Sequence, residues 1–128
     1  MEELPIVLVV EDEVGLQDFA REALSDAGFH PMVTPSGEEA LTSLKSGVVK
    51  YRALVTDISL GRGIDGWALA KLTREVDPLF PIIYMTGAAA DQWASKGVPN
   101  SILLEKPFAP AQLVTAVSQL LNIGNPPA

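Results

Sequence analysis

The sequence predicts an α/β fold in which a doubly wound parallel sheet is built from five strand–helix units. Apolar runs of strand length alternate along the chain with segments whose apolar residues recur at helical spacing. Parallel strands require such crossover connections, and these crossovers are right-handed. The chain has 128 residues, of which 48% are apolar and 20% charged, so its size and composition are those of one globular domain.

The N-terminal part of the chain is predicted to form a strand, a helix and a second strand. Ile6–Val10 is an uninterrupted apolar run, as expected for a strand buried on both faces. A helix follows and ends at Gly28. Its inward residues are Leu16, Phe19, Ala20, Ala23, Leu24 and Ala27. The second strand, Phe29–Val33, contains Pro31, which cannot donate a ladder hydrogen bond, so this strand is expected at an edge of the sheet.

The remainder of the chain continues the alternation. Ser36 and Glu39 form a capping-box pattern that opens a helix, and this helix closes near Gly47. Three further strands are expected over Ala53–Thr56, Pro81–Met85 and Ser101–Leu104. Three further helices are expected: one that places Leu69, Leu72 and Val76 inward and stops at Pro78, one over Ala88–Lys96, and one over Pro110–Leu121.

The composition argues against several classes of function. A net charge of −7 disfavours nucleic acid or an anionic membrane as the main partner, because both require a basic surface. The chain has no cysteine and one histidine, so disulfides, thiolate metal sites and zinc clusters are not expected. No apolar run reaches the length of a membrane span, and the acidic N-terminus has no signal-peptide pattern. A cytoplasmic location is therefore expected.

Polar residues gather where the predicted strands end. Glu11 and Asp12 follow the first strand, Asp57 the third, Thr86 the fourth and Lys106 the fifth. Ligands of open α/β sheets bind at the carboxyl ends of the strands, so we expect these side chains to converge. Carboxylate oxygens from two strands suit a hard divalent cation such as Mg²⁺. The cation, the lysine and the hydroxyl together would form a pocket for a phosphoryl group, with Asp57 as the best-placed nucleophile.

Each of these residues also has a purely structural interpretation. Asp57 alone could cap the loop that follows it, Lys106 alone could be a solvated lysine, and Thr86 could satisfy a backbone group. Their joint placement at strand ends favours a functional site over these interpretations.

Four motifs at the strand ends resemble those of one known family. VVEDE ends the first strand, VTD the third, YMTG the fourth and EKPF the fifth. In this order and spacing they resemble the receiver domain of two-component response regulators over essentially the whole chain. The resemblance implies a five-stranded parallel sheet of order 2-1-3-4-5 with five flanking helices, and strand two is an edge there too. A receiver domain over residues 1–123 is expected, followed by a short flexible tail at 124–128.

The resemblance also implies roles for the matching residues. Asp57 is expected to be the phosphoacceptor and, with Asp12, a direct ligand of Mg²⁺. Glu11 would contact the metal through water, and Ser59 would contribute its backbone carbonyl. Lys106 would pair with the phosphoryl oxygens. Thr86 would bind the phosphoryl group and move with it, and the bond from the lysine to Pro107 is usually cis in this family.

The chain departs from the family pattern in four respects. The loop DISLGRGIDG is one residue longer than usual after the acceptor, and Gly61 replaces a proline. Leu103 replaces the aromatic residue that commonly lies three positions before the lysine, and Gly87 follows the threonine where alanine is frequent. The stretch from Gly87 to Asn100 is short, so the fourth helix is expected to be reduced.

The expected function is a phosphorylatable signalling switch. Its phosphoryl donor would be a histidine kinase or a histidine phosphotransfer protein, and its output an unknown protein target. The chain could be a complete small protein or a piece of a larger regulator. An interaction module that keeps the fold without phosphorylation is the main alternative. A flavodoxin-like carrier and an aspartyl phosphatase are disfavoured, because the first strand ends in EDEV and not in a phosphate loop or an Asp-x-Asp motif.

Overall fold

Five strands and their connecting helices occupy residues 3–122, the part of the chain that the computed structural model describes. The strands are β1 (Ile6–Val10), β2 (His30–Thr34), β3 (Tyr51–Asp57), β4 (Ile82–Thr86) and β5 (Ile102–Glu105). The helices are α1 (Val14–Asp26), α2 (Gly37–Ser46), α3 (Gly66–Val76), the 3₁₀ turn η1 (Ala90–Gln92), α4 (Trp93–Lys96) and α5 (Pro110–Leu121). Within this part of the chain, no helix is long and apolar enough to cross a membrane. The expected tail at 124–128 lies outside the described residues.

The five strands form one parallel sheet in the order β2-β1-β3-β4-β5. The predicted fold class and strand order are therefore confirmed. β1 and β3 pair at the centre, where Val10 lies opposite both Thr34 and Thr56. β2 is an edge strand, as Pro31 indicates. Because the strands are parallel, their carboxyl ends meet at one edge of the sheet, and the residues that follow them are brought together there.

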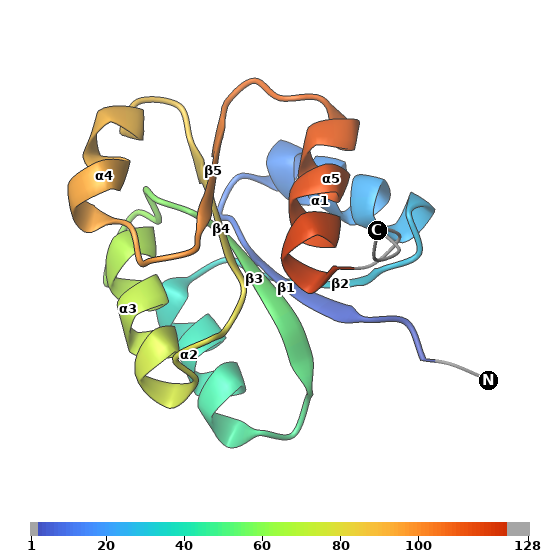
Figure 1. Ribbon diagram of the computed structural model, residues 1–128, viewed down its shortest axis with the longest axis horizontal. Helices are drawn as coiled ribbons and strands as arrows, with labels where there is room; N and C mark the ends of the chain where they lie inside the picture. Colours follow the sequence, from blue (N-terminus) through green and yellow to red (C-terminus); the bar gives the residue numbers. More distant parts are fainter. Residues whose placement is uncertain (1–2, 123–128) are drawn as a thin grey trace.

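Helices cover both faces of the sheet. α1 and α5 lie against one face, and α2 and α3 lie against the other (Figure 1). Successive residues of β1 alternate between these layers: Val7 and Val9 pack with α1 and α5, whereas Leu8 and Val10 pack with α2 and α3. Each of the four is at most 2% exposed. Burial on both faces explains why β1 is an uninterrupted apolar run.

Side-chain caps begin two of the helices, and the first of them, at Ser36, is where the sequence indicates it. At the start of α2, the Ser36 hydroxyl oxygen accepts a hydrogen bond from the Glu39 backbone N–H at 3.2 Å and donates one to the Glu39 carboxylate. α3 begins after Asp65, whose carboxylate accepts from the N–H of Ala68 at 2.8 Å. The prediction that Val76 faces inward is wrong: this side chain is 54% exposed, because it lies in the last turn of α3, beyond the edge of the core.

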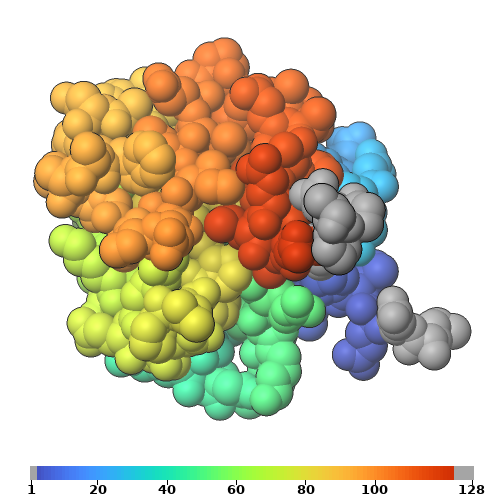
Figure 2. Space-filling view, viewed as in Figure 1, coloured from blue at the N-terminus to red at the C-terminus, as the bar shows by residue number. Residues whose placement is uncertain are grey.

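The connection between β4 and β5 contains little regular helix. The sequence predicts one helix over Ala88–Lys96, whereas the structure has η1 followed by the four-residue α4. The expected shortening is confirmed, and the predicted start of the helix is too early. In the space-filling view, the orange residues around α4 and β5 lie above the yellow-green α3 on the face shown (Figure 2).

Candidate functional site

Three carboxylates converge at the carboxyl edge of the sheet. Glu11 and Asp12 directly follow β1, and Asp57 is the last residue of the neighbouring strand β3. One oxygen of each lies within 4.8 Å of the others. Asp12 is exposed, whereas Glu11 and Asp57 are only 1% and 7% exposed. The structure thus brings together the three acidic residues that the sequence places at strand ends.

A lysine from the loop between β5 and α5 completes this cluster. Nζ of Lys106 lies 3.2 Å from Oδ2 of Asp57 and 3.3 Å from Oε1 of Glu11. The backbone N–H of Lys106 donates to the carbonyl of Thr86 at 2.8 Å, which fixes the loop against the end of β4. The peptide bond to Pro107 is cis, as the family resemblance implies.

The cluster carries more negative charge than its lysine can balance. Three ionised carboxylates and one ammonium leave a formal charge of −2. Burial raises the pKa of Glu11 to about 7; the charge of Asp57 adds to this rise, while hydrogen bonding from the Glu13 N–H and the charge of Lys106 oppose it. Burial also acts to lower the pKa of Lys106, but the two carboxylates beside it outweigh burial, so its pKa is raised and it stays protonated. The surplus negative charge favours binding of a cation.

The available ligand atoms fit a hard divalent cation. Mg²⁺ in proteins is usually held by one or two carboxylates, with waters completing its coordination. The carbonyl of Ser59, two residues beyond Asp57, accepts no hydrogen bond from any residue between 3 and 122. It is therefore free to act as a further oxygen ligand. The oxygen-only set of the cluster is the kind that Mg²⁺ prefers over nitrogen or sulfur.

Thr86 lies at the same edge, but its hydroxyl oxygen contacts the backbone that follows. Oγ1 accepts hydrogen bonds from the N–H groups of Ala88 at 3.2 Å and Ala89 at 2.8 Å. Thr86 is 4% exposed. The structure therefore shows the backbone role that the sequence leaves open for this residue. Because Oγ1 is the acceptor in both bonds, the hydroxyl keeps its own proton for donation.

The loop between β3 and α3 runs close against the site at two glycines. A Cβ at Gly66 would overlap the backbone carbonyl oxygen of Asp57, so only glycine lets α3 begin this close to the strand end. A Cβ at Gly61 would lie 3.5 Å from Oδ2 of Asp12. The sequence analysis does not predict this approach to the site. Sequence reasoning also misses Glu38, which reaches the loop from α2 and belongs to no functional motif.

An apolar groove of about 440 Å³ adjoins the site, between α1 and the loop after β5. It is lined by Glu13, Leu16, Phe19, Lys106, Pro107 and Phe108. The rings of Phe19 and Phe108 meet edge to face, with centroids 5.6 Å apart. Apolar surface therefore lies directly beside the charged cluster.

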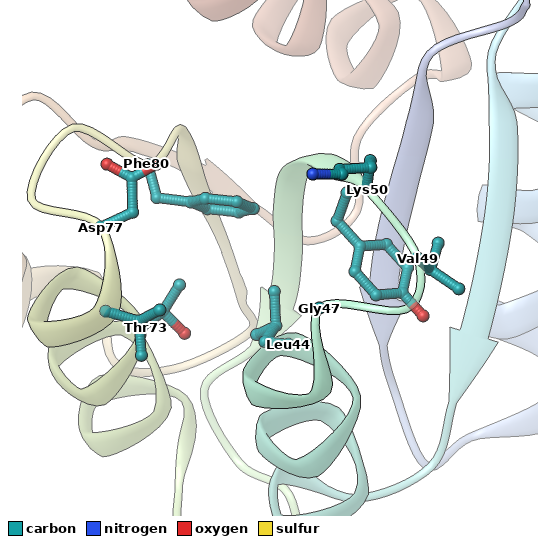
Figure 3. Close-up of a pocket in the computed structure, with 9 residues that line it drawn as sticks. Leu44, Gly47, Val49, Lys50, Thr73, Asp77 and Phe80 are labelled. Carbon is teal, nitrogen blue, oxygen red and sulfur yellow. The ribbon is translucent and has the colours of Figure 1, made fainter.

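A second cavity, of about 320 Å³, lies at the opposite edge of the sheet (Figure 3). It is lined by the ends of α2 and α3, the start of β3 and Phe80, which lies between the turn after α3 and the start of β4. Its lining residues are Leu44, Gly47, Val49, Lys50, Tyr51, Thr73, Val76, Asp77 and Phe80. In the described part of the chain, the only three-residue group suited to hold a metal is the one at the strand ends. None of the three residues of that group lines this cavity, so the cavity is separate from the candidate site.

Comparisons with known proteins agree with this geometry. A family model described as "Response regulator receiver domain" matches residues 7–118. The chain is 49% identical to a solved response regulator receiver protein from Sinorhizobium medicae WSM419, with a TM-score of 0.90. That alignment covers 94% of this chain and 96% of the other.

Two curated relatives differ in length. The response regulator receiver protein CpdR of Brucella abortus (strain 2308) is 31% identical over 90% of this chain and 95% of CpdR. The probable transcriptional regulatory protein SilR of Salmonella typhimurium is 28% identical over 93% of this chain and 52% of SilR. The chain thus spans nearly all of CpdR but about half the length of SilR.

Proposed function

Because this chain belongs to the response regulator receiver family, we propose that it is a two-component signalling switch in which Asp57 is the residue phosphorylated. One observation carries the assignment: Asp57 lies within the carboxylate cluster and also contacts Lys106 at 3.2 Å. An acceptor set between a cation-binding group and a fixed ammonium is what phosphoryl transfer to a carboxylate requires.

The proposed reaction moves a phosphoryl group from a phosphohistidine to Asp57. A carboxylate oxygen of Asp57 bonds to phosphorus while the bond between phosphorus and the histidine nitrogen breaks, which gives an acyl phosphate. Lys106 pairs with the phosphoryl oxygens, and its raised pKa keeps it charged while it does so. Attack of water on the acyl phosphate releases inorganic phosphate and restores the carboxylate.

We assign the cation of this site as Mg²⁺. Asp12 and Asp57 would bind it directly, Glu11 through a water molecule and Ser59 through its backbone carbonyl. When bound, Mg²⁺ offsets the negative charge of the phosphoryl oxygens and of the carboxylates that face them. The donor atoms support this assignment, because the cluster offers carboxylate oxygens and no nitrogen or sulfur ligand.

Thr86 is assigned to donate its hydroxyl hydrogen to the phosphoryl group. A movement of this side chain toward Asp57 would release the N–H groups of Ala88 and Ala89 that it now accepts from. A Cβ added at Gly87 would meet no atom within 4 Å, so the backbone there has room to adjust. Phosphorylation would in this way change the loop between β4 and α4.

The proposed donor is a histidine kinase or a histidine phosphotransfer protein, and the proposed output is a change in contacts with an unidentified protein target. The apolar groove beside Lys106 supports docking of a protein donor next to the acceptor. The net charge of −7 supports protein partners over nucleic acid or membrane for this domain. We further propose a cytoplasmic location, a receiver domain over residues 1–123, and no catalysis beyond the domain's own phosphorylation and dephosphorylation.

The test is phosphorylation by acetyl phosphate, read by intact mass on the wild type and on Asp57→Asn. We expect the wild type to gain one phosphoryl group only when Mg²⁺ is present, and Asp57→Asn to gain none. A gain that persists in Asp57→Asn would place the acceptor elsewhere. A wild type that gains nothing and also fails to bind beryllofluoride would refute the switch.

A further inference from the structure

We propose that Glu38 is a positioning residue for the cation site, because it holds the loop that carries the Ser59 carbonyl and runs beside Asp12. This inference rests on the proposed function, in which Ser59 is a ligand of Mg²⁺. Glu38 lies in the first turn of α2, on an element that contributes no other residue to the site.

The carboxylate of Glu38 contacts the loop directly. Its Oε2 accepts a hydrogen bond from the backbone N–H of Ile64 at 2.7 Å. Within the described part of the chain, no other hydrogen bond, from backbone or side chain, is made to residues 59–64. The restraint on this segment by hydrogen bonding therefore depends on Glu38.

Two glycines allow α2 and the loop to fit together. Gly63 has a φ of +88°, and a Cβ there would overlap the Glu38 carboxylate, which occupies the space of the missing side chain. In the other direction, a Cβ at Gly37 would lie 2.6 Å from Cγ1 of Ile64, whose side chain packs onto the start of α2. The start of α2 and the loop thus approach each other closely at both glycines.

The same loop borders the cation site. Ser59 follows Asp57 by two residues. Gly61 lies beside Asp12, and a Cβ added to Gly61 would be 3.5 Å from Oδ2 of Asp12. Both Gly61 and Gly63 have positive φ, so the intervening backbone is restricted little by its own side chains. Ser59 itself lies between the buried side chains of Ile58 and Leu60, which anchor the start of the loop, so the contact with Glu38 restrains the other end of the loop, from Gly61 to Ile64 beside Asp12.

Helix capping does not account for Glu38. The neighbouring Glu39 makes the capping contacts: its N–H donates to Ser36, and its carboxylate accepts from the hydroxyls of Ser36 and Thr34. A carboxylate in the first turn also suits the helix dipole, but Glu38 and Glu39 are equivalent in that respect. The direction of Glu38, toward Ile64, is explained by the loop contact.

Three variants separate the hydrogen bond from charge and from capping. Glu38→Ala removes the acceptor. Glu38→Gln removes the charge but keeps an oxygen that accepts from the N–H of Ile64. Glu39→Ala removes an equal charge from the adjacent residue, which makes no contact with the loop. Each protein is titrated with MgCl₂ by two-dimensional NMR, and hydrogen exchange of the Ile64 amide is measured on the same samples without Mg²⁺.

For Glu38→Ala we expect the dissociation constant for Mg²⁺ to rise about three- to tenfold and the Ile64 amide to exchange about fivefold faster, as loss of one hydrogen bond implies. Glu38→Gln is expected to stay within about twofold of the wild type in both measurements, because the hydrogen bond is retained. Glu39→Ala is expected to lower thermal stability through its lost cap while leaving Ile64 exchange unchanged.

The outcomes distinguish this inference from the proposed function. A wild type that binds Mg²⁺ and is phosphorylated, with Glu38→Ala binding equally well, would overturn the positioning role alone. Glu38→Gln behaving like Glu38→Ala would assign the effect to charge and overturn it too. A wild type that binds no Mg²⁺ would overturn the proposed function as well, whatever the exchange rate of Ile64.

Discussion

Replacement of Glu11 by Gln should stabilise the protein in the absence of Mg²⁺, and by more as the pH rises. The carboxyl of Glu11 has a pKa of about 7 in the folded protein, against an ordinary value of 4.5. The folded state therefore keeps a proton that the unfolded state has already lost over this range. By linkage, the free energy of unfolding of the wild type falls as the pH rises from 4.5 through 7. Gln cannot ionise, so Glu11→Gln avoids this loss.

The size of the effect follows from the two pKa values. At 1.36 kcal/mol per unit, the difference between them corresponds to about 3 kcal/mol, present in full at pH 8. At pH 5 most of the carboxyl is protonated in the folded state, and the difference is about 1 kcal/mol. For a domain of this length, 1 kcal/mol moves the midpoint of thermal unfolding by about 4 °C, so Glu11→Gln should melt about 12 °C higher than the wild type at pH 8.

The assay is thermal unfolding followed by circular dichroism, in buffers with EDTA between pH 5 and pH 8. Glu13→Gln is the matched control, because Glu13 is exposed and makes no ion pair with Lys106. The gap between Glu11→Gln and the wild type should widen with pH, while Glu13→Gln follows the wild type. Parallel curves for Glu11→Gln and the wild type would refute the argument that burial of this charge destabilises the fold.

Three further predictions concern the metal and the packing around it. Mg²⁺ should raise the melting temperature of the wild type, and Asp12→Ala should abolish that gain; a gain that survives would place the metal elsewhere. Gly66→Ala should cost about 1–3 kcal/mol in urea unfolding and slow phosphorylation, because the new Cβ displaces the backbone of Asp57, and unchanged stability would contradict that close approach. Tyr84→Phe should cost about 1–3 kcal/mol in the same assay, because the buried N–H of Val98 now donates to the Tyr84 hydroxyl at 3.1 Å and would lose its acceptor; a neutral result would mean that water replaces the hydroxyl.

The central parts of the fold and the site can be predicted because each rests on a local pattern. A strand buried on both faces is a run of apolar residues, and its end is marked by the first charged one, so Glu11 and Asp57 are visible in the sequence alone. Parallel topology then forces these ends together. The helical spacing of apolar residues predicts burial less well at the end of a helix. In α3 this spacing continues to Val76, but the sheet surface against which the helix packs has already ended there, so Val76 is exposed.

The surroundings of the site could not be predicted, since they depend on contacts between irregular segments. Glu38 meets Ile64 where two glycines leave room for the contact, and the local sequence, which marks Glu39 as a capping residue, gives Glu38 no partner. Thr86 was predictable as a strand-end hydroxyl, but the two backbone groups that it accepts from are set by the path of the loop after β4.

Because α4 is only four residues long, little free energy is needed to rearrange the segment between β4 and β5. Of the residues between β4 and β5, only the three of η1 and the four of α4 are helical, so few repeating backbone hydrogen bonds hold the segment. Segments of this kind open at a fraction of the free energy of global unfolding. A difference of about 1.4 kcal/mol changes a two-state ratio tenfold, which is within reach of one hydroxyl exchanging its hydrogen-bond partners. The five-stranded sheet thus borders a weakly held segment in which two backbone N–H groups, those of Ala88 and Ala89, donate to one oxygen atom, Oγ1 of Thr86.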